Sequence, residues 1–181
     1  MIEKPPIKRA SRTLIHKGAI IDFYRDIMVH PDGREEAYDF IGHNGAAAVL
    51  PVDRNGKIIL VKQYRNALER YTLEIPAGGL KTPDEPTKEA AIRELEEETG
   101  FRAAEVTKLL TIRTTVAFCN EKIDIYLAKQ LTEGKQHLDE GEYVSFDAYE
   151  LDDLCQRIYD GQIEDSKTVS AIMAYKSMLS V

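Results

Sequence analysis

The stretch "GLKTPDEPTKEAAIRELEEETGF" (residues 79–101) decides the fold, because it joins a loop signal and a helix signal in one short segment. The glycine and prolines at its start predict a loop, and the following residues predict a helix over 86–99. Pro86 suits the first turn of this helix, and Gly100 suits its C-cap. We therefore expect a central helix that follows directly on a glycine-containing loop.

This helix carries a run of glutamates in "RELEEETG" (93–100). At about 100° per residue, Glu94, Glu97 and Glu98 fall within an arc of roughly 100°, beside an apolar stripe that can pack on a sheet. Crowded carboxylates raise one another's pKa unless a positive charge is near. Mg²⁺ prefers hard oxygen ligands, so a metal site is one interpretation. The other interpretation is a solvated acidic helix face, which is the usual role of a charge run.

Strand signals lie on both sides of the helix. The turn "HPDG" (30–33) predicts a hairpin between strand-forming stretches at 11–28 and 35–43. The turn "DRNG" predicts a second hairpin between strands at 46–52 and 57–65. The remaining predicted elements are strands at 71–76 and 122–128, a loop at 77–84, and amphipathic helices at 149–159 and 166–179. This order indicates an α/β fold: an α/β/α sandwich with a mixed sheet, plus N-terminal antiparallel strands.

Length and composition restrict the class of protein. The 181 residues suit one domain with a substantial core and a small extra lobe. The formal charge is −7 and Lys and Arg are scattered, so the basic patch that binds a nucleic-acid polymer is missing. No apolar run reaches the length of a membrane span, and no apolar stretch follows the basic N-terminus. We therefore expect a cytoplasmic protein with a small-molecule substrate, whose two cysteines, Cys119 and Cys155, are reduced.

The fixed positions of residues 79–101 resemble the Nudix box, Gly-x5-Glu-x7-Arg-Glu-U-x-Glu-Glu-x-Gly-U, in which U is apolar. The matching residues are Gly79, Glu85, Arg93, Glu94, Leu95, Glu97, Glu98, Gly100 and Phe101. "QYR" (63–65) and "EIPAGGL" (74–80) further resemble the ADP-ribose pyrophosphatase branch of the Nudix hydrolases. The resemblance implies a Nudix hydrolase domain over 46–181. Over 1–45 it implies a strand-rich dimerisation segment that pairs with a second subunit in a homodimer.

The resemblance also implies a metal site on the helix. Glu94 and Glu98 are the expected catalytic residues and main metal ligands, and Glu97 is a further ligand. Small residues before the box let the backbone approach the metal, so a carbonyl of Ala77 or Gly78 is an expected ligand, with Gly78 as our candidate. Mg²⁺ is the expected ion, and Mn²⁺ is the alternative.

Other positions of the box are expected to support the site. Arg93 and Glu85 are expected to brace the loop and the helix by an ion pair, while Gly79 and Gly100 are structural.

The loop "LDEGEY" (138–143) is the expected source of a general base, which must reach the attacking water. By similarity to the branch, Glu140 is the base and Glu142 is an extra metal ligand. The alternative is an acidic surface loop without a catalytic role.

Substrate contacts are implied at two further positions. Arg65 resembles an arginine that reaches the phosphates, and Glu121 in "AFCNEK" matches a glutamate that contacts the terminal ribose. The alternatives are a surface arginine and a plain loop acid. Phe23 or Tyr24 could stack on a base, although most such aromatic residues lie in a core or an interface.

Two departures from the branch bear on the nucleoside. Val116 stands where the branch tends to carry proline, and Ala37 and Tyr38 stand where it tends to carry arginine. The box predicts the chemistry, and these positions would modify the choice of nucleoside.

We therefore expect an Mg²⁺-dependent pyrophosphohydrolase that cleaves a nucleoside diphosphate linked to another moiety. ADP-ribose, giving AMP and ribose 5-phosphate, is the leading substrate. The alternatives are another nucleoside diphosphate sugar, a dinucleotide, or a non-catalytic nucleotide-sugar sensor. The presence of Glu94, Glu97 and Glu98 together favours the enzyme, since a sensor tolerates their loss.

Overall fold

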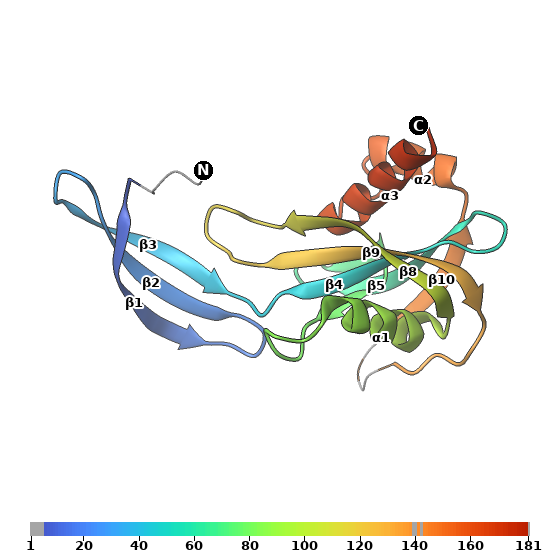
Figure 1. Ribbon diagram of the computed structural model, residues 1–181, viewed down its shortest axis with the longest axis horizontal. Coiled ribbons are helices and arrows are strands. Elements are labelled where there is room, and N and C mark those ends of the chain that lie inside the picture. Colours follow the sequence, from blue (N-terminus) through green and yellow to red (C-terminus); the bar gives the residue numbers. More distant parts are fainter. Residues whose placement is uncertain (1–5, 139–140, 142, 181) are drawn as a thin grey trace. The chain divides into compact units, whose positions relative to one another are not determined.

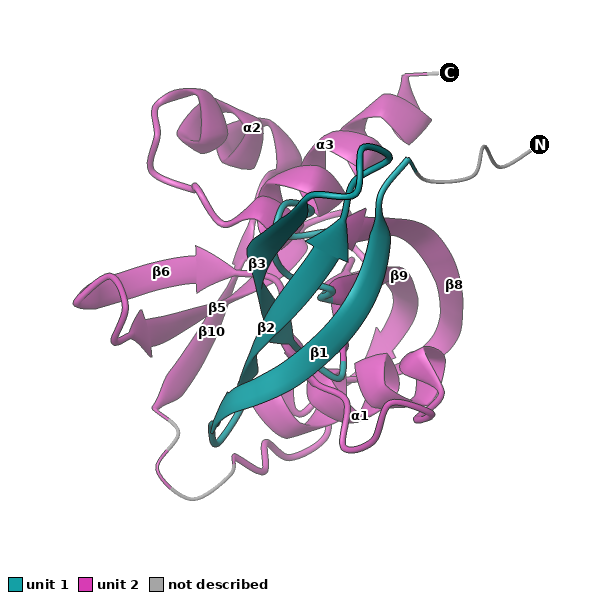
Figure 2. Ribbon diagram, turned by 90° about the vertical axis from the view of Figure 1, so that its left-hand side faces the viewer, with its two compact units in different colours: residues 1–44, 113–121 teal, residues 45–112, 122–181 magenta. Residues whose placement is uncertain are grey.

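The computed structural model describes residues 6–138, 141 and 143–180. The chain divides into two compact units (Figure 2). The first consists of the residues up to 44 together with 113–121, and the second consists of 45–112 and the residues from 122 onward. The first unit therefore takes a short segment from the middle of the chain, in addition to its N-terminal part.

The first unit contains an antiparallel sheet of three strands, in the order β1-β2-β3. They are β1 (Lys8–Lys17), β2 (Asp22–Val29) and β3 (Glu35–Gly42). The hairpin predicted around "HPDG" is confirmed: Gly33 has φ +85° and donates its N–H to the His30 carbonyl at 2.9 Å. The single stretch predicted at 11–28 is wrong, because a turn from Gly18 to Ile21 divides it into two strands.

Among its described residues, the second unit contains two sheets and three helices, whose arrangement Figure 1 shows. The four-stranded mixed sheet has the order β7-β4-β9-β8, with β4 parallel to β9 and antiparallel to β7. Its strands are β4 (Ala46–Pro51), β7 (Ala77–Gly79), β8 (Arg102–Arg113) and β9 (Lys122–Thr132). The three-stranded antiparallel sheet β10-β5-β6 consists of β5 (Ile58–Arg65), β6 (Arg70–Glu74) and β10 (Val144–Tyr149).

The helices are α1 (Thr87–Thr99), α2 (Leu151–Tyr159) and α3 (Ser166–Leu179). They agree closely with the three predicted helices, because each carries a clear apolar stripe or a proline and glycine at its ends. No helix among the described residues is both long and apolar enough to cross a lipid bilayer.

Strand β4 explains why helices lie on both faces of the mixed sheet. All of its residues are buried, and alternate residues face opposite sides. Ala48 and Leu50 belong to an apolar cluster that includes Leu154 of α2 and Ile172 of α3. Val49 belongs to a second cluster that includes residues of α1. The predicted α/β/α sandwich with a mixed sheet is therefore confirmed.

The second predicted hairpin is wrong. A turn does follow β4, with the Asp53 N–H donating to the Lys57 carbonyl at 2.9 Å. Beyond one isolated bridge between Val52 and Ile58, however, β4 and β5 enter different sheets. Both strands are apolar and largely buried, so a local turn signal cannot tell which partners they take.

Candidate active site

The acidic helix α1 packs against the short strand β7. Two of its carboxylates are buried there, since Glu94 is 8% exposed and Glu98 is 3% exposed. The Ala77 N–H donates a hydrogen bond to Oε2 of Glu98 at 3.2 Å. A Cβ added at Gly78 would overlap the Glu94 carboxylate, so the backbone of β7 can approach this closely only with glycine there. The two buried carboxylates, one helical turn apart, thus meet the backbone of one strand.

Arg93 supplies positive charge among the glutamates of the box. Its Nη1 donates to Oε1 of Glu94 at 2.6 Å and to Oε2 of Glu97 at 2.8 Å. Its Nη2 lies 3.5 Å from Oε1 of Glu85. Burial lowers the pKa of Arg93, but the charge of Glu94 and the hydrogen bonds to Glu97 and Glu94 outweigh this effect and raise it. Glu85 also accepts the Lys81 N–H at 2.5 Å, which closes the loop before the helix.

The donor set at this position suits a hard divalent cation. Within 6–138, 141 and 143–180, no three His, Cys, Asp or Glu side chains form a group that could hold a metal ion. Arg93 binds both Glu97 and Glu94, and the side chains of Glu94 and Glu98 are buried against β7. Two carboxylates beside a backbone without a Cβ offer the oxygen ligands that Mg²⁺ prefers. The residues therefore fit a metal held by Glu94 and Glu98, with further ligands from elsewhere.

The C-terminal end of α1 is fixed by the segment that follows β9. Gly100 adopts the left-handed conformation, with φ +75°, and ends the helix. Nε2 of Gln136 donates to the Glu98 carbonyl at 2.6 Å, and the His137 N–H donates to the Glu97 carbonyl at 3.0 Å. This segment leads into the loop at 138–143. The predicted base Glu140 and the predicted ligand Glu142 both lie outside the described residues.

Arg65, at the end of β5, is held by an ion pair. Its Nε and Nη2 donate to the two carboxylate oxygens of Glu74 at 2.7 and 2.5 Å. The hydrogen bond to Glu74 is the main cause that raises the pKa of Arg65, and the charge of Glu98 adds to it. The side chain of Arg65 is 39% exposed. The arginine that we predicted to contact phosphates is thus oriented by the protein itself.

Glu121 belongs to the first unit. Its Oε2 accepts the Thr114 hydroxyl at 2.7 Å, and its Oε1 lies 3.6 Å from Nδ1 of His43. Phe23 and Tyr24 lie in β2 of the same unit.

Sequence reasoning gave no role to the Glu74–Lys167 pair or to Asp124, all three of which are buried. Burial raises the pKa of Asp124, but hydrogen bonds from Thr111 and Lys108 outweigh burial and hold it well below its usual value. Glu74 and Lys167 are far apart in the chain, so no local pattern predicts their pairing. Only the position of Glu74 in "EIP", next to the box, indicated that it lies near the site.

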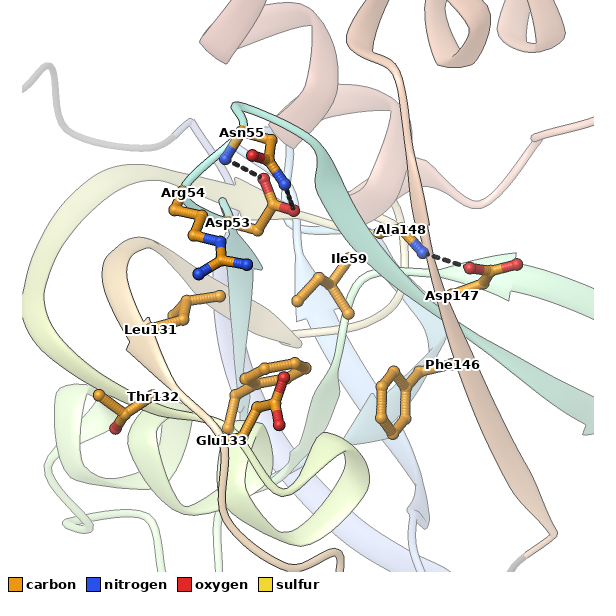
Figure 3. Close-up of a pocket in the computed structure, with 11 residues that line it drawn as sticks. Asp53, Arg54, Asn55, Ile59, Leu131, Thr132, Glu133, Phe146, Asp147 and Ala148 are labelled. Atoms are coloured by element: carbon orange, nitrogen blue, oxygen red, sulfur yellow. Dashed lines mark hydrogen bonds between the residues drawn. The ribbon is translucent and has the colours of Figure 1, made fainter.

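A cavity of about 580 Å³ lies elsewhere in the second unit (Figure 3). Its lining comes from the turn after β4, from Ile59 of β5, from Phe101 after α1, from the end of β9 and from β10. None of the residues predicted for the active site lines it. Cavity size alone therefore does not locate the carboxylate site.

The fold and this site define the chain as an α/β protein in which a carboxylate-bearing helix packs on β7, a short strand that contains two glycines. The crystal structure of an ADP compounds hydrolase has the same fold, with a TM-score of 0.87 and 22% sequence identity. The similarity covers 99% of this chain and 97% of that one.

Sequence comparison gives the family. The family model described as "NUDIX domain" matches residues 42–171. An ADP-ribose pyrophosphatase of Bacillus subtilis is 40% identical over 91% of this chain and 90% of its own length. A methanol dehydrogenase activator of Bacillus methanolicus is 38% identical over 87% of this chain and 86% of its own length. The chain belongs to the Nudix family of hydrolases. The family as a whole generally uses divalent metal ions.

Proposed function

We propose that this Nudix hydrolase cleaves the pyrophosphate of a nucleoside diphosphate linked to another moiety, and that ADP-ribose is its leading substrate. The products are then AMP and ribose 5-phosphate. The observation that carries the proposal is the burial of Glu94 against Gly78 and of Glu98 against Ala77. The name of the Bacillus subtilis relative supports the choice of ADP-ribose.

The proposed cofactor is Mg²⁺, with Mn²⁺ as the alternative. Glu94, Glu98 and the Gly78 carbonyl would hold it, together with Glu97 and Glu142. A bound divalent ion supplies a Lewis acid and lowers the pKa of a water ligand. The protein contributes two fixed carboxylates and a backbone that leaves room beside them.

The remaining residues have proposed roles around this centre. Glu140 removes a proton from the attacking water, and Arg65 binds the phosphates with its oriented guanidinium. Glu121 contacts the terminal ribose. Arg93 and Glu85 keep the loop and helix together, which is supported by their distance of 3.5 Å.

We further propose a cytoplasmic homodimer in which residues 1–45 form the dimerisation segment and 46–181 form the hydrolase domain. This proposal is supported by the exposure of β1 along its whole length and by exposed apolar side chains such as Leu14, Ile15 and Ile20. Light scattering of the purified protein tests it, and a monomer at micromolar concentration would contradict it.

A second candidate function is a nucleotide-binding module that acts on a partner without hydrolysis. The name of the relative described as a methanol dehydrogenase activator supports this second candidate. The intact carboxylate set of the box favours hydrolysis instead.

The deciding experiment measures product release from a panel of ADP-ribose, other nucleoside diphosphate sugars, dinucleotides and nucleoside triphosphates. Each compound is incubated with Mg²⁺, with Mn²⁺, and with chelator. Chelator-sensitive cleavage that prefers ADP-ribose is the expected result. Preference for another compound would make that compound the substrate in place of ADP-ribose. The absence of any cleavage by folded protein would overturn the hydrolase proposal.

A further inference from the structure

Glu74, the last residue of β6, lies at the centre of a buried polar network. Besides the two hydrogen bonds from Arg65, it accepts the Thr72 hydroxyl at 2.6 Å and Nζ of Lys167 at 2.5 Å. Its side chain is 4% exposed. A carboxylate that is removed from water to this extent needs opposite charge and hydrogen-bond donors. Here two cations supply them.

Lys167 lies in the first turn of α3 and is buried as well, with 7% exposure. Its Nζ lies 3.0 Å from Oδ2 of Asp165, the N-cap residue of α3, in addition to its pair with Glu74. Buried lysines are rare unless they are paired. Lys167 therefore places a second positive charge on a carboxylate that already holds Arg65.

This arrangement has a consequence for Arg65. A carboxylate that binds one arginine alone cancels its charge. Here Lys167 binds Glu74 as well, and Asp165 binds Lys167, so the network of two cations and two carboxylates has no net charge. Without Lys167, the same network would carry one net negative charge. Lys167 is buried, whereas Arg65 is part-exposed, so Arg65 is the cation of this network that an anion in solution can reach. Arg65 thus has a fixed orientation and retains attraction for an anion.

The same helix end is connected to the carboxylate site through the chain segment that follows Glu74. The Ile75 N–H donates to Oγ1 of Thr168 at 3.0 Å, and Thr168 is fully buried in the first turn of α3. Two residues later, the Ala77 N–H donates to Oε2 of Glu98. The hydrogen bond to Glu74 is the main cause of the raised pKa of Arg65, and the charges of Asp165 and Glu98 add to it.

We propose that Lys167 is a positioning residue for the substrate: by binding Glu74, it offsets the charge of the carboxylate that orients Arg65, so that the guanidinium stays able to bind the pyrophosphate group. The inference rests on the proposed function, because it gives Arg65 the same anionic ligand.

The test uses the full chain and inorganic pyrophosphate as the probe, with chelator present so that metal does not contribute. Isothermal titration calorimetry measures the dissociation constant for the wild type, Lys167→Met and Lys167→Arg. Lys176→Met is the matched control, since Lys176 lies on the same helix and pairs with Asp152 at 2.5 Å at an exposed position. We expect Lys167→Met to weaken binding about tenfold, Lys167→Arg by less than about threefold, and Lys176→Met not at all.

Double variants separate positioning from a merely structural role. In an Arg65→Gln background, Lys167→Met should weaken binding no further, because Lys167 acts through Arg65. In a Glu74→Gln background, its effect should be smaller than in the wild type, because Asp165 is then the only carboxylate that loses its cation. If Lys167→Met alone does not fold, Lys167→Gln, which removes the charge but keeps a hydrogen-bond donor, is measured in its place.

Wild-type affinity in Lys167→Met would overturn the proposal, and so would equal losses in the wild-type and Arg65→Gln backgrounds. A wild-type protein that does not bind pyrophosphate would also overturn it. Cleavage of ADP-ribose by the wild type with Mg²⁺ is measured in parallel. Failure there overturns the proposed substrate, whereas the pyrophosphate titrations decide the role of Lys167.

Discussion

At the scale of single residues, Glu98 and Glu96 differ in surroundings although one residue separates them. Glu98 is buried and accepts the Ala77 N–H, whereas Glu96 pairs with Arg102 at the surface. Glu98→Gln keeps the shape and removes the charge, so we expect turnover to fall at least about a hundredfold. The free energy of unfolding should stay within about 1 kcal/mol of the wild type.

Glu96→Gln is the control for this prediction, because an exposed ion pair contributes little. Its turnover should stay within about twofold of the wild type. Steady-state kinetics with Mg²⁺ and urea unfolding of both variants give the answer. Near-normal turnover in Glu98→Gln would show that Glu98 is not a metal ligand.

Gly78 and Gly79 allow a second residue-scale prediction. An added Cβ overlaps the Glu94 carboxylate at Gly78, but it meets no atom within 4 Å at Gly79. Gly78→Ala must therefore displace Glu94 or β7, and we expect kcat/KM to fall about tenfold or more. The loss of kcat/KM in Gly79→Ala should be clearly smaller. Kinetics of the two variants, compared with each other, test this order, and a larger loss in Gly79→Ala would contradict it.

The residues of the box could be found from sequence because their spacing is fixed within one segment. The buried lysine that pairs with Glu74 could not be found in this way. Lys167 follows it by 93 positions, and only folding brings α3 to the end of β6. Likewise, the spacing of Arg93 and Glu97 allows an ion pair along the helix, but the sequence gives no sign that Arg93 also binds Glu94 or that Glu94 and Glu98 are buried. These differences arise from packing, which a helical wheel does not contain.

At the scale of elements, the C-terminal end of α1 makes a testable contact. Gly100 and Gly161 both have positive φ, at +75° and +70°, but only a Cβ at Gly100 would meet backbone, including the Gln136 nitrogen at 2.7 Å. Gly161→Ala should therefore lower the free energy of unfolding by about 1 kcal/mol, because of its backbone conformation alone. Gly100→Ala should lower the free energy of unfolding further, since it also displaces the segment that holds the last turn of α1.

Urea unfolding of both variants measures this difference directly. The excess loss in Gly100→Ala reports the packing of the segment at 134–137 against α1. Equal losses in the two variants would mean that this segment moves away without cost.

Elements with strong local signals were predictable, and those defined by distant partners were not. The three helices follow from periodicity and end signals in the chain. Strand β7 was predicted to be a loop, because only its pairing with β4 makes three small residues a strand. Strands β8 and β10 were missed, and the supposed hairpin of β4 and β5 divides between two sheets. Pairing of strands is a long-range property, so turn chemistry fixes only part of it.

At the scale of the whole molecule, stability in acid depends on buried carboxylates. Burial raises the pKa of Glu74, but the hydrogen bond from Arg65 and the charge of Lys167 outweigh burial and lower it from 4.5 to about 2. Because the folded pKa is the lower one, unfolding becomes easier as protons bind. The contribution of this group is complete above pH 4.5 and is lost as the pH falls through about 2.

The shift corresponds to a contribution on the order of 3 kcal/mol to the free energy of unfolding at neutral pH, of which about 2 kcal/mol should be gone at pH 3. Glu74→Gln lacks the titrating group, so it should be less stable than the wild type at pH 7 and should lose less stability on acidification. Urea unfolding of both proteins at pH 7, 5, 4 and 3 measures the gap between them. The gap should narrow steadily below pH 5, because Asp124 and the other carboxylates titrate in both proteins alike. A constant gap from pH 7 to pH 3 would mean that the Glu74 carboxylate does not depend on Arg65 and Lys167 for its low pKa.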